Sequence, residues 1–550
     1  MRVTPSRPRA RGVEGFSLDR ARELAVRRFG LRSLHREQEQ AIGAVAKGQD
    51  VLVVLPTGSG KSLCYQLPAM LFDRPSVVVS PLLALIRDQH SKLQRLRLPV
   101  SRLDSTVPAA ERRNALEMIA NGGPRVVLTT PETLESEPLV DALQCSGVAL
   151  LAVDEAHCIS EWGHDFRPAY LRLPASIERL RPRSLMALTA TATARVREEI
   201  NRALGMEASE LVVAPPHRHN LLLSVEHWIG TQKLPRLAKL IRSLPRPGII
   251  YCATVDSVDR IGAALRAADI PSAQYHGRMK TAAREEAQQL FMSPERRIVM
   301  IATSAFGMGI DKPNIRYIVH YHATGSLEQY LQEAGRAGRD GRRSHCILQY
   351  DPDDLAIQAR LAAQGRPSPQ ALARLASALI EWSGEKDGVD ASSLALSAQV
   401  TAASARALLG LLDERGITTR RGARYKLAVS PDEFLALSRD LAGRFDTLRR
   451  EDERRLAAVE QYASSDACRS VFLRAYFGEE APPRCGQCDR CAPRERESLA
   501  VPRRQARRPA QRAGTATHPK HPPGNRGGRD RRRRRSRRRR PPTAAPDGGV

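Results

Sequence analysis

The sequence has no uninterrupted apolar run that approaches the roughly 18 residues that a membrane-spanning helix requires. Its first twenty residues contain arginine and proline, and they lack the apolar segment that a secretory leader carries. Both absences argue against a membrane-embedded or exported protein. We therefore expect a soluble, cytoplasmic chain without a membrane partner.

Acidic residues are scarce relative to basic ones, with 60 Asp and Glu against 87 Lys and Arg, which gives a net charge of +27. Such a charge predicts a polyanionic partner. The excess is uneven, because residues 501–550 hold 16 Arg and one Lys against two Asp, a net charge of +15. More than half of the net positive charge therefore lies in the last fifty residues.

Large apolar residues are nearly absent after Pro493, where Arg, Pro, Gly and Ala dominate. This composition cannot bury a core, so residues 495–550 are predicted to form a disordered Arg-rich tail, and residues 1–18 a flexible N-terminus. Nine of the ten residues 531–540 are arginine. The run could be a merely solvated segment, but our hypothesis is a sequence-independent DNA or RNA tether.

Cysteine is used sparingly, and only four of the nine cysteines form a pattern. The other five are scattered among apolar neighbours and are expected to be small buried hydrophobic residues. The pattern is Cys468-x16-Cys485-x2-Cys488-x2-Cys491, whose spacing predicts a structural Zn²⁺ site within residues 452–494. Arg469 and Arg474 are expected to help hold these cysteines as thiolates.

A chain of 550 residues is too long for one core, and its 42% hydrophobic content can fill several. Short, unalternated apolar runs are separated by helical patterns, which predicts an α/β fold with parallel sheets buried on both faces. Two lobes are expected, at residues 19–205 and 206–350. The predicted strands are Val51–Leu55, Ser76–Ser80, Arg125–Thr130, Ala149–Asp154, Ser184–Thr191, Gly248–Cys252, Ile298–Ser304, Tyr317–His322 and His345–Tyr350.

Residues 366–430 depart from this alternation. Helical patterns at Ser368–Trp382 and Thr401–Glu414 precede two strand-like pieces around Gly422, with arginines in the hairpin. One interpretation is a small helical, winged-helix-like unit. The alternative is a helical spacer with an exposed basic hairpin, and the sequence does not decide between them.

A phosphate-binding loop follows the first apolar run. Gly58 and Gly60 allow the backbone to wrap phosphates, Lys61 can contact the β- and γ-phosphates, and the Ser62 hydroxyl can ligate Mg²⁺. The strict pattern has glycine where this chain has Leu55. The predicted ATP-binding residues in this loop are Thr57, Gly58, Ser59, Gly60, Lys61 and Ser62.

Two adjacent carboxylates, Asp154 and Glu155, end a later apolar run and are followed by Ala156 and His157. Their position at the carboxyl end of a strand suits two separate tasks, with Asp154 on Mg²⁺ and Glu155 polarising the attacking water. Acidic residues at strand ends also occur on solvated rims. The phosphate loop upstream favours the catalytic interpretation.

A third motif, Gln332–Arg339, lies about 270 residues beyond the phosphate loop. Arg336 and Arg339 can stabilise charge that develops on the γ-phosphoryl group, and we assign this role chiefly to Arg339. Gln332 is expected to order the surroundings of the catalytic water. One ATP gripped between two lobes would explain both motifs.

These motifs, with Ser80–Gln89, Thr129–Glu132, Leu188–Thr193 and Ala302–Pro313 between them, resemble superfamily 2 helicases and specifically the RecQ family of DNA helicases. The motif-bearing resemblance covers residues 29–350 and resumes near 452–491. It implies two RecA-like lobes that clamp Mg·ATP and step 3′-to-5′ along single-stranded DNA, with duplexes carrying a single-stranded overhang as substrates. It also implies a place in DNA repair or recombination and, in a prokaryote, association with the nucleoid.

Residues 158–167 resemble the aromatic-rich loop of this family. The resemblance implies that Trp162, Phe166 and Arg167 sense single-stranded DNA and relay its presence to His157. A core Trp and Phe that close the lobe are the alternative. Upstream, Gln38 occupies the position of the family's adenine-reading glutamine, whose amide can pair with adenine N6 and N7.

The chain also departs from the RecQ pattern. The family's usual Phe-Arg pair before Gln38 is Leu34-His35, and about a hundred residues separate the second lobe from the cysteines, which normally follow it directly. A winged helix normally follows the zinc module, where this chain has its basic tail. An RNA helicase, or a DNA-binding or strand-annealing scaffold with weak ATPase activity, are the rival functions. The aromatic-rich loop and the complete ATP-site residues argue against them.

Overall fold

The computed structural model of the protein describes residues 16–123, 125–160, 167–206, 208–307, 310–365 and 368–492. The predicted N-terminal segment before residue 16, the basic tail, and Trp162 and Phe166 lie outside the described residues. Two parallel sheets and one small antiparallel sheet organise the described part of the chain.

The first sheet has seven parallel strands in the order β3-β4-β2-β5-β6-β1-β7. Its inner strands are short, fully buried apolar runs, as the sequence predicts for a sheet covered on both faces. The strands are β1 Val51–Val54, β2 Ser76–Val79, β3 Val100–Leu103, β4 Val126–Thr129, β5 Leu150–Val153, β6 Ser184–Thr189 and β7 Glu210–Val213.

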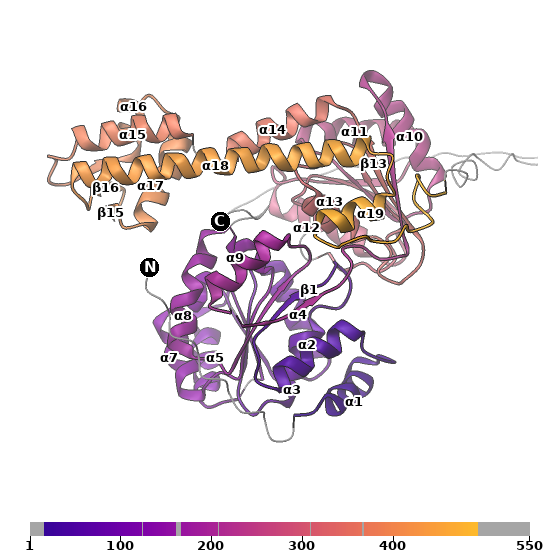
Figure 1. The fold of residues 1–550 in the computed structure, drawn as a ribbon, viewed down its shortest axis with the longest axis horizontal. Coiled ribbons are helices and arrows are strands. Elements are labelled where there is room, and N and C mark those ends of the chain that lie inside the picture. Colours follow the sequence, from indigo (N-terminus) through magenta and orange to yellow (C-terminus); the bar gives the residue numbers. More distant parts are fainter. Residues whose placement is uncertain are drawn as a thin grey trace, which may run out of the picture. The chain divides into compact units, whose positions relative to one another are not determined.

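Helices cover both faces of the first sheet (Figure 1). One layer consists of α1 Leu18–Phe29, α2 Arg36–Ala46, α3 Leu63–Leu71 and α4 Leu83–Arg95. The other consists of α5 Ala109–Ala120, α6 Pro131–Leu134, α7 Glu137–Ser146, α8 Leu173–Leu180 and α9 Ala194–Leu204, with short 3-10 helices at Ala156–Ile159 and Pro168–Arg172.

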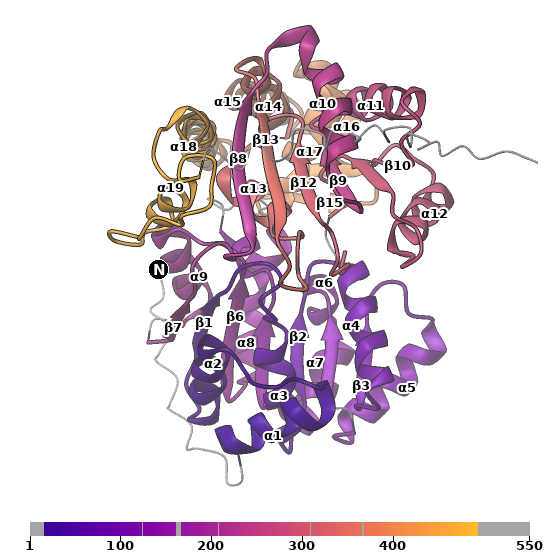
Figure 2. The same ribbon diagram turned by 90° about the vertical axis from the view of Figure 1, so that its right-hand side faces the viewer.

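The second sheet has six parallel strands in the order β10-β11-β9-β12-β13-β8 (Figure 2). These strands are β8 Leu221–His227, β9 Gly248–Tyr251, β10 Ser272–Tyr275, β11 Val299–Ala302, β12 Tyr317–His320 and β13 Ser344–Tyr350. The accompanying helices are α10 Lys233–Ser243, α11 Val255–Ala267, α12 Thr281–Met292, α13 Leu327–Ala334 and α14 Asp353–Gly365, with a 3-10 turn at Gly230–Gln232.

All nine predicted strands are present, and each prediction agrees with the structure to within two residues at either end. Four strands of the two sheets were missed, namely β3, β7, β8 and β10. Every one of them is an edge strand. The prediction of two α/β lobes is therefore confirmed, and the strands that it missed all lie at the edges of the sheets.

The region after α14 forms a third unit with its own core. Its helices are α15 Pro369–Glu381, α16 Ala391–Ser397 and α17 Ala402–Glu414. Its antiparallel sheet has the order β14-β16-β15, formed by β14 Val389–Asp390, β15 Thr418–Arg421 and β16 Arg424–Leu427. The helices and the hairpin predicted here are present, and β14 adds a strand that a helical spacer would not have.

A single helix of 34 residues, α18 Pro431–Ser464, connects this third unit to the cysteine region (Figure 1). It runs through residue 452, where the zinc module was predicted to begin, so that predicted boundary falls inside a helix. The short helix α19 Arg469–Tyr476 follows.

No single helix among the described residues is long and apolar enough to cross a membrane. One bent pair, Ala391–Ser397 with Ala402–Asp413, passes on length and composition, with a bend of 113°. Its leucines Leu394, Leu408, Leu409 and Leu412 are buried in the core of the third unit.

Candidate nucleotide site and zinc centre

The phosphate loop connects β1 to α3 at the carboxyl edge of the first sheet. Gly58 and Gly60 have φ values of +83° and +78°, which L side chains rarely adopt. The Ser59 hydroxyl donates to the carbonyl of Pro56 at 2.7 Å, and Ser62 is the N-cap residue of α3. A loop of this shape at a helix N-terminus presents backbone N–H groups to an anion.

Lys61 lies beside the two candidate carboxylates. Its ammonium donates to the carbonyl of Leu55 at 3.0 Å, which closes the loop on itself. Burial lowers the pKa of Lys61, while the charges of Glu155 and Asp154 partly offset this and that of Arg339 adds to it. The lysine is therefore within electrostatic reach of groups from both sheets.

Asp154 is buried, directly after β5. Burial and the neighbouring Glu155 carboxylate raise its pKa to about 7, and Lys61 opposes the shift. Its main chain is fixed on both sides, because its N–H donates to the carbonyl of Val79 at 2.8 Å and its carbonyl accepts from the Tyr170 hydroxyl at 2.8 Å. A carboxylate held in this way is a preorganised ligand for a divalent cation.

Glu155 has a left-handed backbone, with φ +49° and ψ +45°. This conformation is uncommon for a residue with a side chain, and such strain gathers at functional sites. The carboxylate lies 3.3 Å from His157 Nδ1, which is 3.0 Å from the hydroxyl of Thr189. The sequence Asp154–His157 is thereby connected to the end of β6.

Gln38 is buried on α2, and its side-chain amide is engaged by the main chain. Its nitrogen donates to the carbonyls of Ser59 at 3.0 Å and Gly60 at 3.2 Å, and its oxygen accepts from the His35 N–H at 2.9 Å. The structure therefore places Gln38 against the phosphate loop. Its predicted reading of adenine remains a prediction.

The two arginines of the third motif have different environments. Arg339 lies against the phosphate loop, because a Cβ added to Gly58 would be 3.0 Å from its Cγ. Arg336 is buried, with its guanidinium donating to the carbonyl of Gly307 within the second sheet's own domain. Only Arg339 of this pair is placed beside the phosphate loop.

Arg339 is also part of a charge network between the two sheets' domains. Its Nη1 donates to Asp311 at 2.7 Å, and Asp311 also pairs with Lys92 of α4. Among the residues that the structure describes, the buried Nε of Arg339 has no hydrogen-bond partner. The guanidinium therefore retains a donor for a ligand.

Arg218 was not predicted from the sequence. Its guanidinium donates to three carbonyls of residues 335–338, at 2.8 Å to Gly335 and to Gly338, and more closely to Ala337. A Cβ on Gly58 would lie 3.4 Å from its Cζ. Arg218 follows β7 in a segment with no recognisable motif, so no local signal could have identified it.

The remaining predicted residues are placed as follows. Thr57 lies against Gly335, because a Cβ there would be 2.8 Å from the Cβ of Thr57. Gln332 is partly exposed on α13. Arg167 donates from Nη1 to the carbonyl of Pro81 at 3.0 Å, beside the loop that follows β2.

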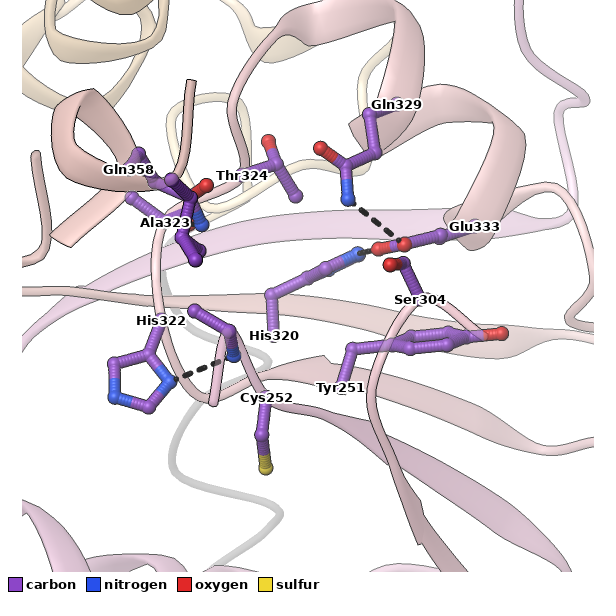
Figure 3. Close-up of a pocket in the computed structure, with 12 residues that line it drawn as sticks. Tyr251, Cys252, Ser304, His320, His322, Ala323, Thr324, Gln329, Glu333 and Gln358 are labelled. Carbon is purple, nitrogen blue, oxygen red and sulfur yellow. Dashed lines mark hydrogen bonds and ion pairs between the residues drawn. The ribbon is translucent and has the colours of Figure 1, made fainter. Parts of the chain in front are cut away.

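A small polar pocket of about 60 Å³ lies at the carboxyl edge of the second sheet (Figure 3). In its floor the buried His320 pairs through Nε2 with Glu333 at 2.9 Å, and Gln329 donates to the other oxygen of that carboxylate at 3.1 Å. Ser304 borders the same pocket. Glu333 lies near the end of α13, directly before the loop that carries Arg336 and Arg339, which we call the arginine loop. The pocket is therefore connected to the arginine loop.

The four patterned cysteines converge. Their sulfur atoms all lie within 4.8 Å of one another, a suitable cluster for one tetrahedral Zn²⁺. Burial raises the pKa of Cys488 to about 12, whereas for Cys468 backbone N–H donors outweigh burial and lower the pKa to about 6. The predicted ligand set Cys468, Cys485, Cys488 and Cys491 is brought together as expected.

The predicted role of Arg469 and Arg474 in holding the cysteines as thiolates remains a prediction, and the charge of Cys468 is one of the causes that raise the pKa of Arg474. Arg469 forms a two-bond pair with Asp489, at 3.0 and 3.1 Å, and Arg474 pairs with Glu479. Both guanidinium groups thus pair with carboxylates, and the main-chain N–H of Arg469 donates to Cys488, at 3.4 Å. Spacing alone could not show this, because Asp489 reaches Arg469 through the fold around the cysteines.

The same module is attached to the second sheet. Asp489 accepts from the N–H of Val225 at 3.2 Å and donates its own N–H to Leu223, both on β8. The Tyr476 hydroxyl donates to Glu328 of α13 at 3.1 Å. The cysteine module therefore stabilises the helix that leads to the arginine loop.

Two parallel sheets, with a phosphate loop on one and an arginine of the other lying against it, define a two-lobed nucleotide-dependent motor. Family models match the same regions: DEAD/DEAH box helicase at residues 35–200, helicase conserved C-terminal domain at 232–341, and RecQ zinc-binding at 438–492. The third match coincides with the cysteine cluster and supports Zn²⁺ as its metal.

The chain is 31% identical over 477 residues to the ATP-dependent DNA helicase RecQ of Bacillus subtilis, covering 86% of this chain and 67% of that protein. It is 31% identical over 464 residues to the RecQ of Haemophilus influenzae, with 84% and 62% covered. The chain belongs to the RecQ family of ATP-dependent DNA helicases. It spans about two thirds or less of the length of these curated relatives.

Among solved structures, the DNA- and AMPPNP-bound helicase MrfA superposes with a TM-score of 0.52 at 18% identity, covering 76% of this chain and 63% of that one. At this level of identity the likeness shows the two-lobed fold. The function of the site follows from its own residues.

Proposed function

We propose that this protein separates the strands of duplex DNA by coupling ATP hydrolysis to movements of its two RecA-like lobes. The observation that supports this most strongly is the contact of Arg339, from the second lobe, with Gly58 of the phosphate loop on the first. Binding or hydrolysis of ATP at the phosphate loop would then change contacts in both lobes. Such nucleotide-dependent contact between lobes is what a motor requires.

The nucleotide roles follow from these positions. Lys61 would neutralise phosphate charge, Glu155 would orient and polarise the attacking water near Gln332, and Arg339 would stabilise the transition state. Ser62 and Asp154 would hold Mg²⁺, which supplies positive charge at the phosphate oxygens when bound. Gln38 would bind the adenine base and connect it to the phosphate loop, since its amide donates to the carbonyls of Ser59 and Gly60.

The DNA roles concern the aromatic-rich loop, His157 and the pocket beside Ser304. Arg167 and the aromatic residues Trp162 and Phe166 would sense single-stranded DNA, and His157 would transmit its presence to Glu155 and Thr189, which it contacts. The pocket beside Ser304 would face the DNA backbone on the second lobe. We infer 3′-to-5′ movement on overhang-bearing duplexes in DNA repair or recombination, with nucleoid association in a prokaryote.

Strand displacement with ATP tests the proposal on matched duplexes that carry a 3′ or a 5′ single-stranded overhang. Displacement of the strand from the 3′-overhang substrate alone is expected. Parallel ATPase measurements with no nucleic acid, single-stranded DNA or RNA would distinguish the rivals. Stimulation by RNA alone would indicate an RNA helicase, and strand annealing without stimulated ATPase would indicate a scaffold.

Lys61→Ala is expected to lower the DNA-stimulated ATPase rate about 10²- to 10³-fold while leaving DNA binding nearly intact, because the ammonium acts on phosphates. Glu155→Gln is expected to bind ATP and turn over poorly. Steady-state ATPase and fluorescent-nucleotide binding measure the two effects. Rates within twofold of the unmodified protein for either variant would remove its residue from the catalytic assignment.

Trp162→Ala is expected to retain nucleotide binding and lose stimulation by DNA, because stacking on a base would be the signal rather than the chemistry. The ratio of ATPase rates with and without single-stranded DNA measures this, with a melting curve as control. A variant that simply unfolds would favour a core role for this tryptophan.

A further inference from the structure

Three of the four basic residues in the hairpin of β15 and β16 lie on one face, and the fourth, Arg420, lies on the other face beside Tyr425. The pairing register places Arg421 opposite Arg424 and Thr419 opposite Lys426, so these four side chains share a face. All four are exposed, whereas Tyr425 on the other face is buried in the core of the third unit. Residues 418–427 contain no carboxylate.

Arg421 and Arg424 lie directly opposite each other near the tip of the hairpin. Like charges directly opposite each other on antiparallel strands repel and destabilise the pairing. Arg424 donates one bond to the carbonyl of Gly388, at 3.1 Å, and its neighbour on β14 is Asp390, whose carboxylate accepts from the N–H groups of Ser392 and Ser393. An external anion that bridges the two guanidinium groups would remove this repulsion.

The shape of the element indicates which anion fits. A two-stranded β-ribbon is narrow enough to enter the major groove of a DNA duplex. Single-stranded nucleic acid is bound by stacking bases on exposed aromatic rings, and the only aromatic residue of the hairpin, Tyr425, is 7% exposed. The face offers charge and no stacking platform, which suits duplex phosphates.

The hairpin is joined to the motor by one continuous helix. At its start, α18 contributes Phe434, Leu441 and Phe445 to the core of the third unit. Near its end, Val459 and Tyr462 belong to the core of the second lobe. At 1.5 Å per residue the 34-residue helix is about 50 Å long.

The end of α18 contacts the helix that carries the arginine loop. The Tyr462 hydroxyl donates to that of Tyr330 at 3.3 Å, with the ring centroids 5.4 Å apart. Tyr330 lies on α13, two residues before Gln332. The unit that carries the hairpin therefore packs against one end of α18, and the helix that leads to Arg336 and Arg339 packs against the other end.

We propose that the Arg421–Arg424 face is a second DNA-binding site, which holds the phosphate backbone of the duplex and moves with the second lobe. This proposal rests on the helicase function proposed above. It assigns duplex binding to a unit that precedes the zinc module in this chain.

The binding step is tested with the full chain carrying Arg421→Glu and Arg424→Glu. A blunt DNA duplex is expected to bind at least tenfold more weakly at low salt, and the slope of log K against log salt is expected to fall by about 1.8, or 0.9 per lost phosphate contact. Single-stranded DNA affinity and the single-strand-saturated ATPase rate should stay within twofold. Arg421→Lys with Arg424→Lys should keep most duplex binding.

A matched control carries Arg28→Glu and Arg113→Glu, the same charge change on exposed residues of α1 and α5. Unchanged duplex affinity, an equal loss in the control, or an equal loss of single-strand affinity would overturn the proposal. An equal or larger loss for an RNA duplex would identify RNA as the partner and overturn it as well. Absence of DNA-stimulated ATPase in the unmodified protein would instead refute the helicase function.

The mechanical step is tested in the exposed middle of α18. Arg449→Gly with Arg450→Gly introduces a flexible point, and Arg449→Ala with Arg450→Ala removes the same charges but keeps the helix. The glycine variant is expected to retain duplex affinity and ATPase rate but unwind at least threefold fewer base pairs per ATP than the alanine variant. Equal yields would overturn the coupled movement.

Discussion

Arg339→Ala is expected to lower the DNA-saturated ATPase rate about 10³- to 10⁵-fold, the range for removal of an arginine that stabilises phosphoryl-transfer charge. The reason is positional, because Arg339 lies against Gly58 and keeps a buried Nε donor without a partner. ATP binding should weaken far less than turnover. Steady-state kinetics together with nucleotide binding would separate these effects.

Arg336→Ala is the informative comparison. This side chain is 5% exposed and donates to the carbonyl of Gly307, which also accepts from the N–H of Ile310 at 3.2 Å, so its loss removes a buried, charge-assisted hydrogen bond. We expect a stability cost of about 1–3 kcal/mol, visible in a melting curve. If Arg336→Ala abolished turnover without loss of stability while Arg339→Ala retained it, the assignment of the two arginines would be reversed.

Cys485→Ser is expected to remove the metal and unfold the region around the cysteines. Zinc binding supplies about 10–16 kcal/mol to small modules of this kind, far more than their apolar burial provides. Because the cysteines share a core with α13 and α18, the loss should also reach the second lobe and lower its melting temperature. Metal analysis should fall from about one zinc per chain to nearly none.

Cys145→Ser provides the control, since Cys145 is an exposed cysteine outside the cluster. It should keep both the zinc content and the melting temperature. Absence of zinc from the unmodified protein would contradict the metal assignment. Zinc retained in full by Cys485→Ser would exclude Cys485 as a ligand.

The strands that the sequence predicted and those that it missed differ in one physical respect. Interior strands such as β1 and β5 are covered on both faces, which requires the continuous apolar runs that are visible in the sequence. The missed strands β3, β7, β8 and β10 lie at sheet edges. Partial exposure admits polar residues such as Arg102 and Gln274, so β3 and β10 contain no apolar run, whereas β7 contains the short run Leu211–Ala214. β8 opens with three leucines, but its Ser224 and Glu226 break the run.

The candidate site divides along similar lines. Chemistry that is local in sequence was predictable: the phosphate loop needs its glycines and Lys61 within one turn, and zinc needs four thiols at short spacing. The predicted cysteines do converge. The placement of Thr57 to Ser62 beside Asp154 also follows from strands that end at one edge of a parallel sheet.

By itself, then, the sequence determined the α/β class, the interior strands, the phosphate loop and the zinc ligands, because each depends on residues that are neighbours along the chain. Tertiary structure alone decided that Arg339, to which the sequence chiefly assigned the role, lies against Gly58, and that Arg218 donates to the carbonyls of Gly335 and Gly338. It also decided that α18 connects the basic hairpin to α13. Such contacts join residues that are far apart in the sequence, or they depend on the orientation of a buried side chain. The spacing of residues along the chain predicts neither.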